Sequence, residues 1–599
     1  MTKPHLVLCG NVRAPKMPAA WKEAPVLRLA LGKDRHDVHL RLDHLSKRLA
    51  AGLPEVAIDL LELAAYVYAA DQAVTRGGRV EIDYGERWRR YFRFEIPVRR
   101  PDIWRTAPIK EALTQTLSFL SDDDYEFHFT RRRDPPPLSR YLFDAVEDDT
   151  DMEEVTLFSG GLDSLGGAVR EIVQGRRKVV LVSHWSNAKI CSRQRQLVAC
   201  LNERSASARY HPLHVAVAVN KGKSLGRDFN QRTRSFLFAA VSAVVARVFG
   251  LSRVRFYENG PVSLNLPVSP QVVGGRSSRT THPRVLKGLS CLLGGLFERP
   301  FQLQNPFLWD TRKEVLEGIK SAGCGSLCAL TSSCAHTWEQ TTEQPHCGRC
   351  SQCLDRRLAA LSAGLSDDED PPQRYRSDVV LAPIAGADLI LAERYVGHLL
   401  QAENIADAMA FLTHYPEVAR VLRHVDESPA QAAALALDLY RRHARAVCGG
   451  LAAAARPFVD PLTWRGVPLN SLLGITYSRL ACPAAGGDKP PQRGRPPTHA
   501  ARQSSLVLDK ELFAARFGDR CCSLGNTVEF RLLDRLNSRP GRYVSVDTLR
   551  QDVWDDLETA KNTIQRTICN LRRRLRAAGL TGVSIDGVQK DHYRLVLPA

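Results

Sequence analysis

The strongest chemical signature in the chain is a six-residue loop, residues 159–164, which reads SGGLDS and follows the apolar run 155–158. Two adjacent glycines let the backbone approach a bound group closely and adopt angles that strain other residues. Residues 164–173 have a helical pattern, and main-chain amides at a helix start attract anions. We therefore predict that the loop binds the phosphates of a nucleotide. The predicted binding residues are Ser159, Gly160, Gly161, Leu162, Asp163 and Ser164.

Two residues of this loop are predicted to be catalytic, Asp163 and Ser164. The hydroxyls of Ser159 and Ser164 can donate hydrogen bonds to phosphate oxygens, whereas the Asp163 carboxylate would repel them. A carboxylate suits Mg²⁺, so we expect Asp163 to hold, directly or through water, the Mg²⁺ ion that accompanies a nucleotide. The loop lacks the lysine of a Walker A motif. The alternative is an ordinary strand-to-helix turn that contains two glycines.

Four cysteines form a second cluster with recognisable spacing. Cys347, Cys350 and Cys353 make two overlapping C-x-x-C units, which place three sulfurs on one tight turn, and Cys334 lies on the preceding loop. Four thiolates without an open coordination position suit a structural, tetrahedral Zn²⁺ ion. An iron–sulfur cluster uses similar spacing, and unliganded or redox-active thiols are a third alternative. The predicted metal ligands are Cys334, Cys347, Cys350 and Cys353.

Neighbouring histidines and cysteines are assigned other roles. We expect His336 and His346 to be polar loop residues rather than ligands, and Cys324 and Cys328 to be core residues.

The loop and the cysteine cluster together resemble 7-cyano-7-deazaguanine synthase, a PP-loop enzyme of the queuosine pathway. That family combines an SGGxDS loop near the start of its sheet with a late C…CGxCxxC zinc site, and residues 155–361 carry both patterns here. The resemblance implies that the nucleotide is ATP, that it is split into AMP and pyrophosphate, and that an oxygen of the substrate is adenylated. It also implies the cofactors ATP, Mg²⁺ and Zn²⁺.

The chain departs from that family where the substrate should bind. The family's tyrosine-glycine-glutamine segment is replaced by residues 184–187 (HWSN), Ser235 replaces an asparagine after Arg234, and the turn after Tyr257 reads ENG. The acceptor is therefore either a 7-carboxy-7-deazaguanine-like small molecule or a protein. Arg234 and Lys189 are further candidate phosphate contacts. The N-terminal extension, which contains Trp88, residues 96–98 (IPV) and the pair Asp102-x-Trp104, and the helical insert resemble the diverged synthase-like proteins of anti-phage defence islands, notably the Qat system. This resemblance implies partners from a defence operon.

The elements that must position these groups alternate between strands and helices. Strand-like runs at 155–158, 177–182, 214–219 and 254–257 are separated by helical patterns at 164–173, 192–202 and 235–249. This alternation predicts an α/β fold with a mostly parallel sheet covered by helices. The resemblance implies that the fold is of the PP-loop, adenine nucleotide alpha hydrolase-like type. We predict an accessory α+β domain at 1–150, the PP-loop domain at 151–365, a helical domain at 375–480 and a flexible linker at 481–505.

Residues 506–599 are predicted to form a separate nucleic-acid-binding domain. Helical patterns at 526–537 and 546–553 precede a third helix whose core stripe is Ile564, Ile568, Leu571 and Leu575, and a hairpin pattern follows. Three helices and a hairpin describe a winged helix, which resembles the DNA-binding domain of OmpR/PhoB-type response regulators. The third helix would enter the major groove, so we predict DNA contacts from Arg566, Arg572, Arg573 and Arg574. The alternative is a winged helix that binds protein.

Bulk properties agree with a multidomain chain that contacts polyanions. A length of 599 residues suggests several domains, and a formal charge of +18 favours polyanionic partners, although arginine from a GC-rich genome is an alternative. The 15 cysteines are an odd number spread through a long chain, unlike a disulfide scaffold. No apolar run reaches the length of a membrane helix and no secretory signal is visible. We therefore expect a cytoplasmic protein without membrane contact.

The leading interpretation is an ATP-dependent C–N ligase of the 7-cyano-7-deazaguanine synthase type, joined to a DNA-binding winged helix and implied to act in anti-phage defence. The first alternative is a transcription regulator whose PP-loop domain senses a nucleotide without cleaving it. The second is an RNA-modifying PP-loop enzyme such as a tRNA thiolase. A thiolase would need a reactive cysteine near the loop, for which Cys191 and Cys328 are the candidates.

Overall fold

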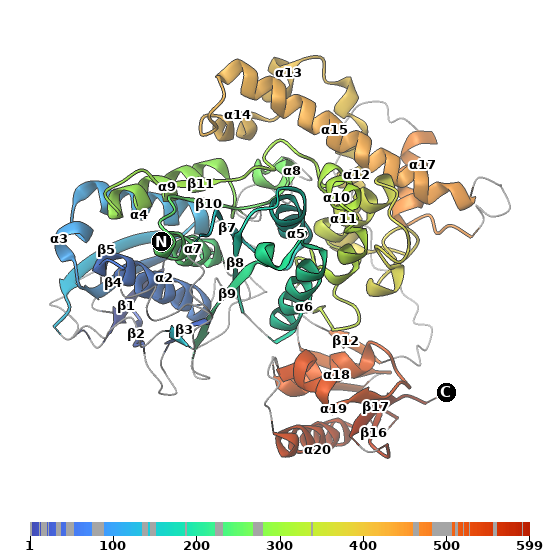
Figure 1. Ribbon diagram of the computed structural model, residues 1–599. Coiled ribbons are helices and arrows are strands. Elements are labelled where there is room, and N and C mark those ends of the chain that lie inside the picture. Colours follow the sequence, from blue (N-terminus) through green and yellow to red (C-terminus); the bar gives the residue numbers. More distant parts are fainter. Residues whose placement is uncertain are drawn as a thin grey trace. The chain divides into compact units, whose positions relative to one another are not determined.

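The computed structural model places the chain in two compact units, shown in Figure 1. The first consists of residues 1–186, 193–338 and 346–481, and the second of residues 187–192, 339–345 and 482–599. The described residues are 3–10, 12, 21, 23–31, 38–43, 53–74, 89–133, 142–143, 151–185, 188–221, 232–266, 279–336, 339–458, 466–481, 506–509, 513–518, 520–525, 527–554, 560–580, 582–589 and 591–598. The predicted linker at 481–505 lies outside them except for its first residue.

A seven-stranded sheet is the centre of the first unit. Its strand order is β11-β10-β7-β8-β9-β3-β6. The strands from β7 to β11 are parallel, and β3 joins β9 in the antiparallel sense. Both faces of β8 are buried, which explains its unbroken apolar sequence. The bounds are β3 (Val38–Asp43), β6 (Leu142–Phe143), β7 (Glu154–Leu157), β8 (Val179–His184), β9 (Leu213–Lys221), β10 (Arg253–Arg255) and β11 (Gln302–Gln304).

Helices cover both faces of this sheet, as the alternating sequence pattern predicts. Alternate residues of β8 belong to different cores, with Val180 and Val182 packed in one and Val179 and Leu181 in the other. The first face holds α7 (Arg234–Val248) and α9 (Pro283–Leu296). The second holds α5 (Leu162–Ala168), its continuation η3 (Val169–Gln174), α6 (Ala188–Arg204) and α10 (Arg312–Ser321). The mixed α/β architecture with a parallel sheet is confirmed.

A second, four-stranded parallel sheet lies in the N-terminal part of the same unit. Its order is β2-β1-β4-β5, and the crossing helices are α2 and α4. Helix α2 is buried on nearly its whole circumference, because it packs against this sheet and against α7. The bounds are β1 (Lys3–Cys9), β2 (Val26–Leu29), α2 (Glu55–Ala73), β4 (Arg90–Val98), α3 (Pro101–Trp104), α4 (Ala107–Ser121) and β5 (Asp124–Arg131).

A buried ion network joins this N-terminal sheet to α7. The guanidinium of Arg90, at the start of β4, donates to Asp71 of α2 and, at 2.7 Å, to the Asp123 carboxylate. All three side chains are at most 2% exposed. Asp71 also accepts from the Thr233 hydroxyl at 2.9 Å, just before α7. Each carboxylate is thus hydrogen-bonded, as a buried charge must be.

The helical segment after residue 380 forms a core together with the cysteine cluster. The longest helix, α15 (Pro429–Ala455), packs along α11 (Ser351–Ser362). The other helices are α8 (Gly260–Ser263), α12 (Gly386–Leu400), α13 (Ala408–His414), α14 (Pro416–Leu422) and α17 (Leu472–Ala481). The three regions predicted at 1–150, 151–365 and 375–480 therefore lie within one compact unit, because shared cores cross the expected boundaries.

The C-terminal residues of the second unit have the architecture predicted for a winged helix. Helices α18 (Val528–Asn537), α19 (Val546–Leu549) with its continuation η11 (Arg550–Trp554), and α20 (Lys561–Ala577) enclose one apolar core. The hairpin of β16 (Ser584–Asp586) and β17 (His592–Val596) follows, and β15 (Val544–Ser545) pairs with β17. Three antiparallel strands that the sequence patterns did not indicate precede α18: β12 (Val507–Asp509), β13 (Ala514–Phe517) and β14 (Arg520–Ser523).

None of the helices in the described part of the chain is long and apolar enough to cross a membrane.

Replacement of Asp123 by alanine should destabilise the first unit strongly. The change leaves the buried Arg90 guanidinium with one carboxylate fewer, and breaking a buried pair in this way costs about 3–5 kcal/mol. Urea denaturation of the full chain, followed by tryptophan fluorescence, measures the effect. Asp102→Ala is the control, because the Asp102 carboxylate and its partner Arg100 are both exposed and little change is expected. Equal effects of the two substitutions would contradict the role assigned to the network.

Candidate functional site

The glycine loop begins where β7 ends. The Phe158 amide still pairs with β8, donating to the Val182 carbonyl at 2.8 Å. Gly160 has a φ of +78°, a region that side chains disfavour. A Cβ on Gly161 would lie 3.2 Å from Ser159 Oγ and 3.4 Å from the Ser332 carbonyl oxygen. The positive φ favours glycine at position 160, whereas a side chain at position 161 would meet two close contacts. Helix α5 starts immediately after them at Leu162.

The loop is held from two sides. Gln194, on α6, donates from Nε2 to the carbonyl oxygens of Phe158 and Ser159 at 3.3 and 3.0 Å. On the other side, the Ser332 amide donates to the Gly160 carbonyl at 3.3 Å. Within the loop, Ser164 Oγ donates to the Gly161 carbonyl at 2.9 Å and lies 3.1 Å from Ser159 Oγ. The two serines predicted to contact phosphate are thus adjacent in space.

Asp163 presents one carboxylate oxygen to protein donors and keeps the other without a partner. Its Oδ2 accepts from Asn259 Nδ2 at 3.0 Å and from Arg312 Nη2 at 3.3 Å. Its Oδ1 is buried and has no hydrogen-bond partner among the described residues. Buried polar atoms are normally satisfied, so the unpaired oxygen makes Asp163 a candidate for cation binding. The sequence did not indicate either Asn259 or Arg312 as a partner.

The strand order places this loop at a switch point of the sheet. From β7 the chain continues to β8 and β9 on one side, and then returns to β10 and β11 on the other side of β7. In open α/β sheets, ligands bind at the carboxyl ends of the strands at the point where the order reverses in this way. Residues 158–161 follow the carboxyl end of β7 and therefore occupy that position.

A second set of unpartnered polar atoms lies at the carboxyl end of β8. His184 is 2% exposed, and both of its ring nitrogens lack a hydrogen-bond partner in the described structure. Its ring meets Tyr68 and Phe238 edge-on, with centroids 5.2 and 5.8 Å apart. Burial, and then repulsion from Arg234, lower the pKa of His184 to about 3. Ser235 is also buried, with an unpartnered hydroxyl. Both residues lie where the sequence departs from the synthase family.

The carboxyl group of Glu258, just beyond β10, is a further candidate functional group to which the sequence motifs assign no role. Burial raises the pKa of Glu258 to about 7, opposed by a hydrogen bond from Thr281, and Asp163 raises it further by repulsion. A carboxyl group with a pKa near neutrality can exchange protons at physiological pH. In the sequence, Glu258 is the first residue of the turn after Tyr257, where the chain departs from the synthase family.

The two basic residues suggested as extra phosphate contacts lie in different surroundings. Arg234 begins α7, with its guanidinium 5.8 Å from the centre of the Phe238 ring. Lys189, in the second unit, donates from its ammonium group to the Gln340 carbonyl at 2.8 Å.

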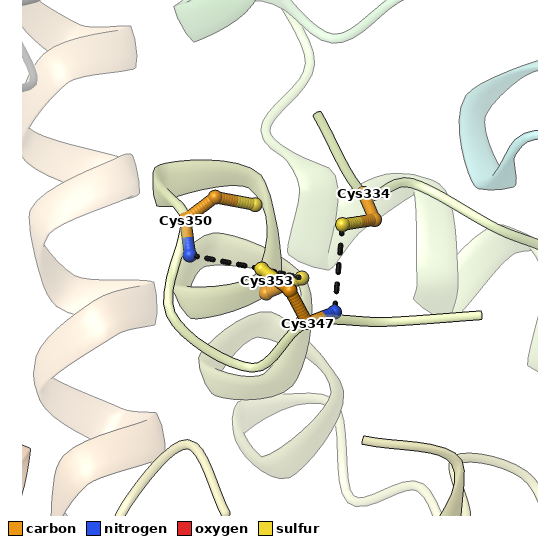
Figure 2. A group of neighbouring side chains, drawn as sticks. All are labelled: Cys334, Cys347, Cys350 and Cys353. Atoms are coloured by element: carbon orange, nitrogen blue, oxygen red, sulfur yellow. Dashed lines mark hydrogen bonds between the residues drawn. The ribbon is translucent and has the colours of Figure 1, made fainter. Parts of the chain in front are cut away.

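The four predicted metal ligands come together in the first unit (Figure 2). Their sulfur atoms all lie within 4.8 Å of one another, and all four side chains are buried. The Sγ of Cys347 accepts from the amides of Arg349 and Cys350 at 3.4 Å, and the Sγ of Cys334 accepts from the Cys347 amide at 3.4 Å. Such N–H···S bonds favour thiolates. The donor set and its compactness fit a tetrahedral Zn²⁺ ion.

The turn that carries these cysteines is closely packed. Gly348 has a φ of +80°, and a Cβ there would lie 1.9 Å from the Ser377 carbonyl oxygen. His346 stacks on Tyr375, with ring centroids 4.7 Å apart, and does not belong to the four-sulfur group. Cys324 and Cys328 are buried in the core of the first unit, as expected.

A cavity of about 840 Å³ lies elsewhere in the first unit, beside edge strand β11. Arg170, Arg255, Lys287 and Trp309 are among the residues that line it, and none of the lining residues belongs to the glycine loop. The Leu303 amide at this edge donates to Ser290 Oγ at 2.9 Å. We assign no role to this cavity.

The four arginines predicted to bind DNA divide into two pairs on α20. Arg572 donates to the Ile585 carbonyl at 2.8 Å, and Arg574 donates to the Ser523 carbonyl at 2.8 Å, so both hold parts of the domain together. Arg566 and Arg573 are exposed. They are seven residues apart, which places them on the same side of the helix. These two are the better placed for DNA.

Comparison with known proteins identifies the C-terminal domain. Residues 524–595 match the family described as transcriptional regulatory protein, C terminal. The match covers α18, α19 and α20 and extends into β17, so this domain is a DNA-binding domain of the transcription-regulator type, as predicted. No curated protein matches the chain at a significant level. The resemblance of residues 155–361 to the deazaguanine synthases stays a prediction.

Metal analysis of the purified full chain should find about one Zn²⁺ ion per chain, as a closed four-thiolate site binds. Cys353→Ser removes one ligand and should abolish stoichiometric zinc, measured by elemental analysis after dialysis against a weak chelator. Cys324→Ser is the control, since Cys324 is equally buried but lies outside the four-sulfur group. Iron with acid-labile sulfide, or no metal at all, would show that the assignment is wrong.

Arg566→Ala and Arg573→Ala should each weaken binding to a 30-base-pair duplex, and each should reduce the slope of log K against log salt by about 1. Fluorescence anisotropy at several salt concentrations gives this slope. Arg516→Ala, an exposed arginine on β13 that pairs with Asp509, is the control with an expected unchanged slope. Unchanged slopes for both α20 variants would place the DNA-binding face elsewhere.

Proposed function

We propose that the chain binds ATP with Mg²⁺ at residues 159–164 and splits it into AMP and pyrophosphate, thereby activating an oxygen of an acceptor. The observation that carries this proposal is the position of the loop. It combines a glycine-dependent turn, a helix start and the switch point of a parallel sheet. Under this proposal the domain is of the PP-loop type, and the C-terminal domain delivers the chain to DNA.

The residues of the loop fit the parts of a magnesium nucleotide. The amides that open α5 lack partners within the helix, so they can donate to phosphate oxygens. The hydroxyls of Ser159 and Ser164 lie at the same turn. The unpartnered Oδ1 of Asp163 would hold the metal ion, while Arg312 and Asn259 fix the carboxylate through its other oxygen. The bound nucleotide supplies an α-phosphorus that an acceptor oxygen can attack.

The acceptor would lie next to the loop, at the carboxyl end of β8. The ring of His184, whose nitrogens are unpartnered, contacts the rings of Tyr68 and Phe238, and Ser235 adds a buried unpartnered hydroxyl. Such a site suits a planar polar ligand, because the rings give apolar contact and the polar atoms give orientation. We therefore favour a ligase of the 7-cyano-7-deazaguanine synthase type that forms a C–N bond after adenylation. Its acceptor is a 7-carboxy-7-deazaguanine-like molecule or a protein, and its proposed setting is anti-phage defence.

A second candidate function is a transcription regulator that senses ATP without cleaving it. The family match of residues 524–595 favours this alternative, since the matched domain is of the transcription-regulator type. A regulator would bind a defined DNA site and release no pyrophosphate. The RNA-thiolase alternative is disfavoured at Cys328, because burial raises the pKa of this thiol to about 12 and a reactive cysteine needs its thiolate form.

Mass spectrometry can separate the enzyme from the regulator. The full chain would be incubated with ATP, Mg²⁺, an ammonium salt as the nitrogen donor and 7-carboxy-7-deazaguanine, and both small molecules and co-expressed proteins would be analysed. A new nitrile, amide or protein adduct that requires ATP is expected. ATP binding with no product and no pyrophosphate would favour the regulator.

Asp163→Ala should abolish pyrophosphate release from ATP, a loss of at least about 100-fold, because the site loses its carboxylate for Mg²⁺. Pyrophosphate is measured by a coupled phosphate assay, and circular dichroism checks that the fold is retained. Asp438→Ala provides the control, since Asp438 is an exposed carboxylate that pairs with Arg442 on α15. Normal turnover by the Asp163 variant would rule out this role of the loop.

A further inference from the structure

The guanidinium of Arg312 is shared between the glycine loop and α11. Its Nη2 donates to Asp163 Oδ2 at 3.3 Å, and its Nη1 pairs with Asp355 Oδ2 at 2.8 Å. Nη2 also donates to the side-chain oxygen of Gln352 at 2.9 Å. The side chains of Arg312, Asp355 and Asp163 are 3%, 9% and 12% exposed. One buried cation thus faces two carboxylates and lies closer to the one outside the loop.

The charges of these three side chains do not balance. Two carboxylates and one guanidinium have a formal net charge of −1. A charge away from water is unfavourable unless it is paired, and the unpartnered Oδ1 of Asp163 is an atom at which a cation can supply the missing charge. If Arg312 paired with Asp163 alone, that pair would be neutral and would attract a cation less. The pairing of Arg312 with Asp355 therefore strengthens the attraction of Asp163 for a cation.

Two consecutive residues of α15 hold the two members of this pair in place. Arg442 Nη1 donates to Glu314 Oε1 at 2.6 Å. Glu314 caps the start of α10, where Arg312 is the first residue. His443, which is buried, has its Nδ1 3.8 Å from Asp355 Oδ1. Helix α15 therefore fixes the start of α10 and the Asp355 carboxylate at the same time.

Helix α12 holds the same carboxylate from another side. The hydroxyl of Tyr395, a fully buried side chain, donates to Asp355 Oδ1 at 3.4 Å. One oxygen of Asp355 thus faces α12 and α15, whereas the other pairs with Arg312. The orientation of this carboxylate is therefore set by helices that lie more than 200 residues beyond the glycine loop in the sequence.

We propose that Asp355 is a positioning residue of the nucleotide site, and that helices α12 and α15 take part in that site through it. By holding the Arg312 guanidinium, Asp355 leaves Asp163 with the excess negative charge that favours Mg²⁺. This inference rests on the proposed function for the identity of the cation and of the nucleotide. It concerns binding only, so it does not depend on cleavage of ATP.

The test measures the affinity of the full chain for ATP by isothermal titration calorimetry, once with Mg²⁺ and once with a chelator. In Asp355→Asn the gain in affinity that Mg²⁺ provides should fall about 10-fold, because the Arg312 guanidinium is left to Asp163. The affinity for metal-free ATP should fall less than about twofold, since the site has lost a negative charge. A merely structural defect would lower both affinities equally. Asp355→Glu keeps the charge and should recover part of the gain.

A double variant keeps the inference testable where the single one folds poorly. Arg312→Gln with Asp355→Asn removes both charges and restores the formal charge of −1 at Asp163. Removing both members of a buried pair is also less disruptive than removing one. The gain from Mg²⁺ should therefore return to within about threefold of that of the parent chain, a non-additive result that indicates coupling between the two residues. A double variant that responds to Mg²⁺ no better than Asp355→Asn overturns the inference.

Asp370→Asn is the matched control. Asp370 is a buried carboxylate that pairs at 3.1 Å with Arg356, which lies on α11 like Asp355. Its gain from Mg²⁺ should equal that of the parent chain. An unchanged gain in Asp355→Asn overturns the inference, as does an equal loss in Asp370→Asn. A parent chain that binds no ATP, or binds it independently of Mg²⁺, overturns it too. The expected changes without any release of pyrophosphate support the inference and count against the ligase.

Discussion

Strand β7 lies between β8 and β10, and the chain reaches these two neighbours by connections that run in opposite directions across the sheet. The rest of the first unit depends on this position. Helices α5 and α6 lead from β7 to β8 and β9 on one face, whereas α7 carries the chain back across the other face to β10. The residues after β7 therefore lie between diverging connections and remain accessible from the carboxyl edge. A glycine turn at any other strand of this sheet would meet a different environment, because only here does the order reverse.

A chain of buried charges connects that turn to the helices beyond residue 350. Arg312 contacts Asp163 on one side and, at 2.8 Å, Asp355 of α11 on the other. The hydroxyl of Tyr395 on α12 donates to Asp355 at 3.4 Å. The same helix α11 contains Cys353, a predicted metal ligand, and Asp355, whose carboxylate is linked to the loop through Arg312. The cysteine cluster is thus connected to the glycine loop through one helix.

The C-terminal domain shows how a basic helix divides its charges between folding and binding. Two arginines of α20 are used inside the domain, where they donate to main-chain carbonyls of the hairpin and of β14. Both guanidinium groups thereby hold the hairpin and β14 against α20. The two that remain exposed share one side of the helix. A basic sequence run is therefore a poor guide to which residues contact DNA, because local hydrogen bonding is decided by the tertiary fold.

The sequence alone determined those elements whose patterns depend only on residues that are neighbours in the chain. The run before residue 159, the glycine pair and the following helical pattern indicated the strand, turn and helix, because backbone strain and periodicity depend on neighbours in the chain. The C-x-x-C spacing indicated that Cys347, Cys350 and Cys353 share one turn. The apolar stripe of α20 indicated a core face, and the match of residues 524–595 agrees with that domain assignment.

Only the tertiary structure decided which distant groups meet. It joined residues 1–150 to the sheet through β3 and α2, a connection that is invisible locally because strand partners lie far apart in sequence. It placed Arg312 between Asp163 and Asp355, and it left His184 without hydrogen-bond partners among the described residues at the end of β8. The physical reason is the same in each case: burial and electrostatic pairing depend on packing between elements, and composition or spacing along one element does not record them.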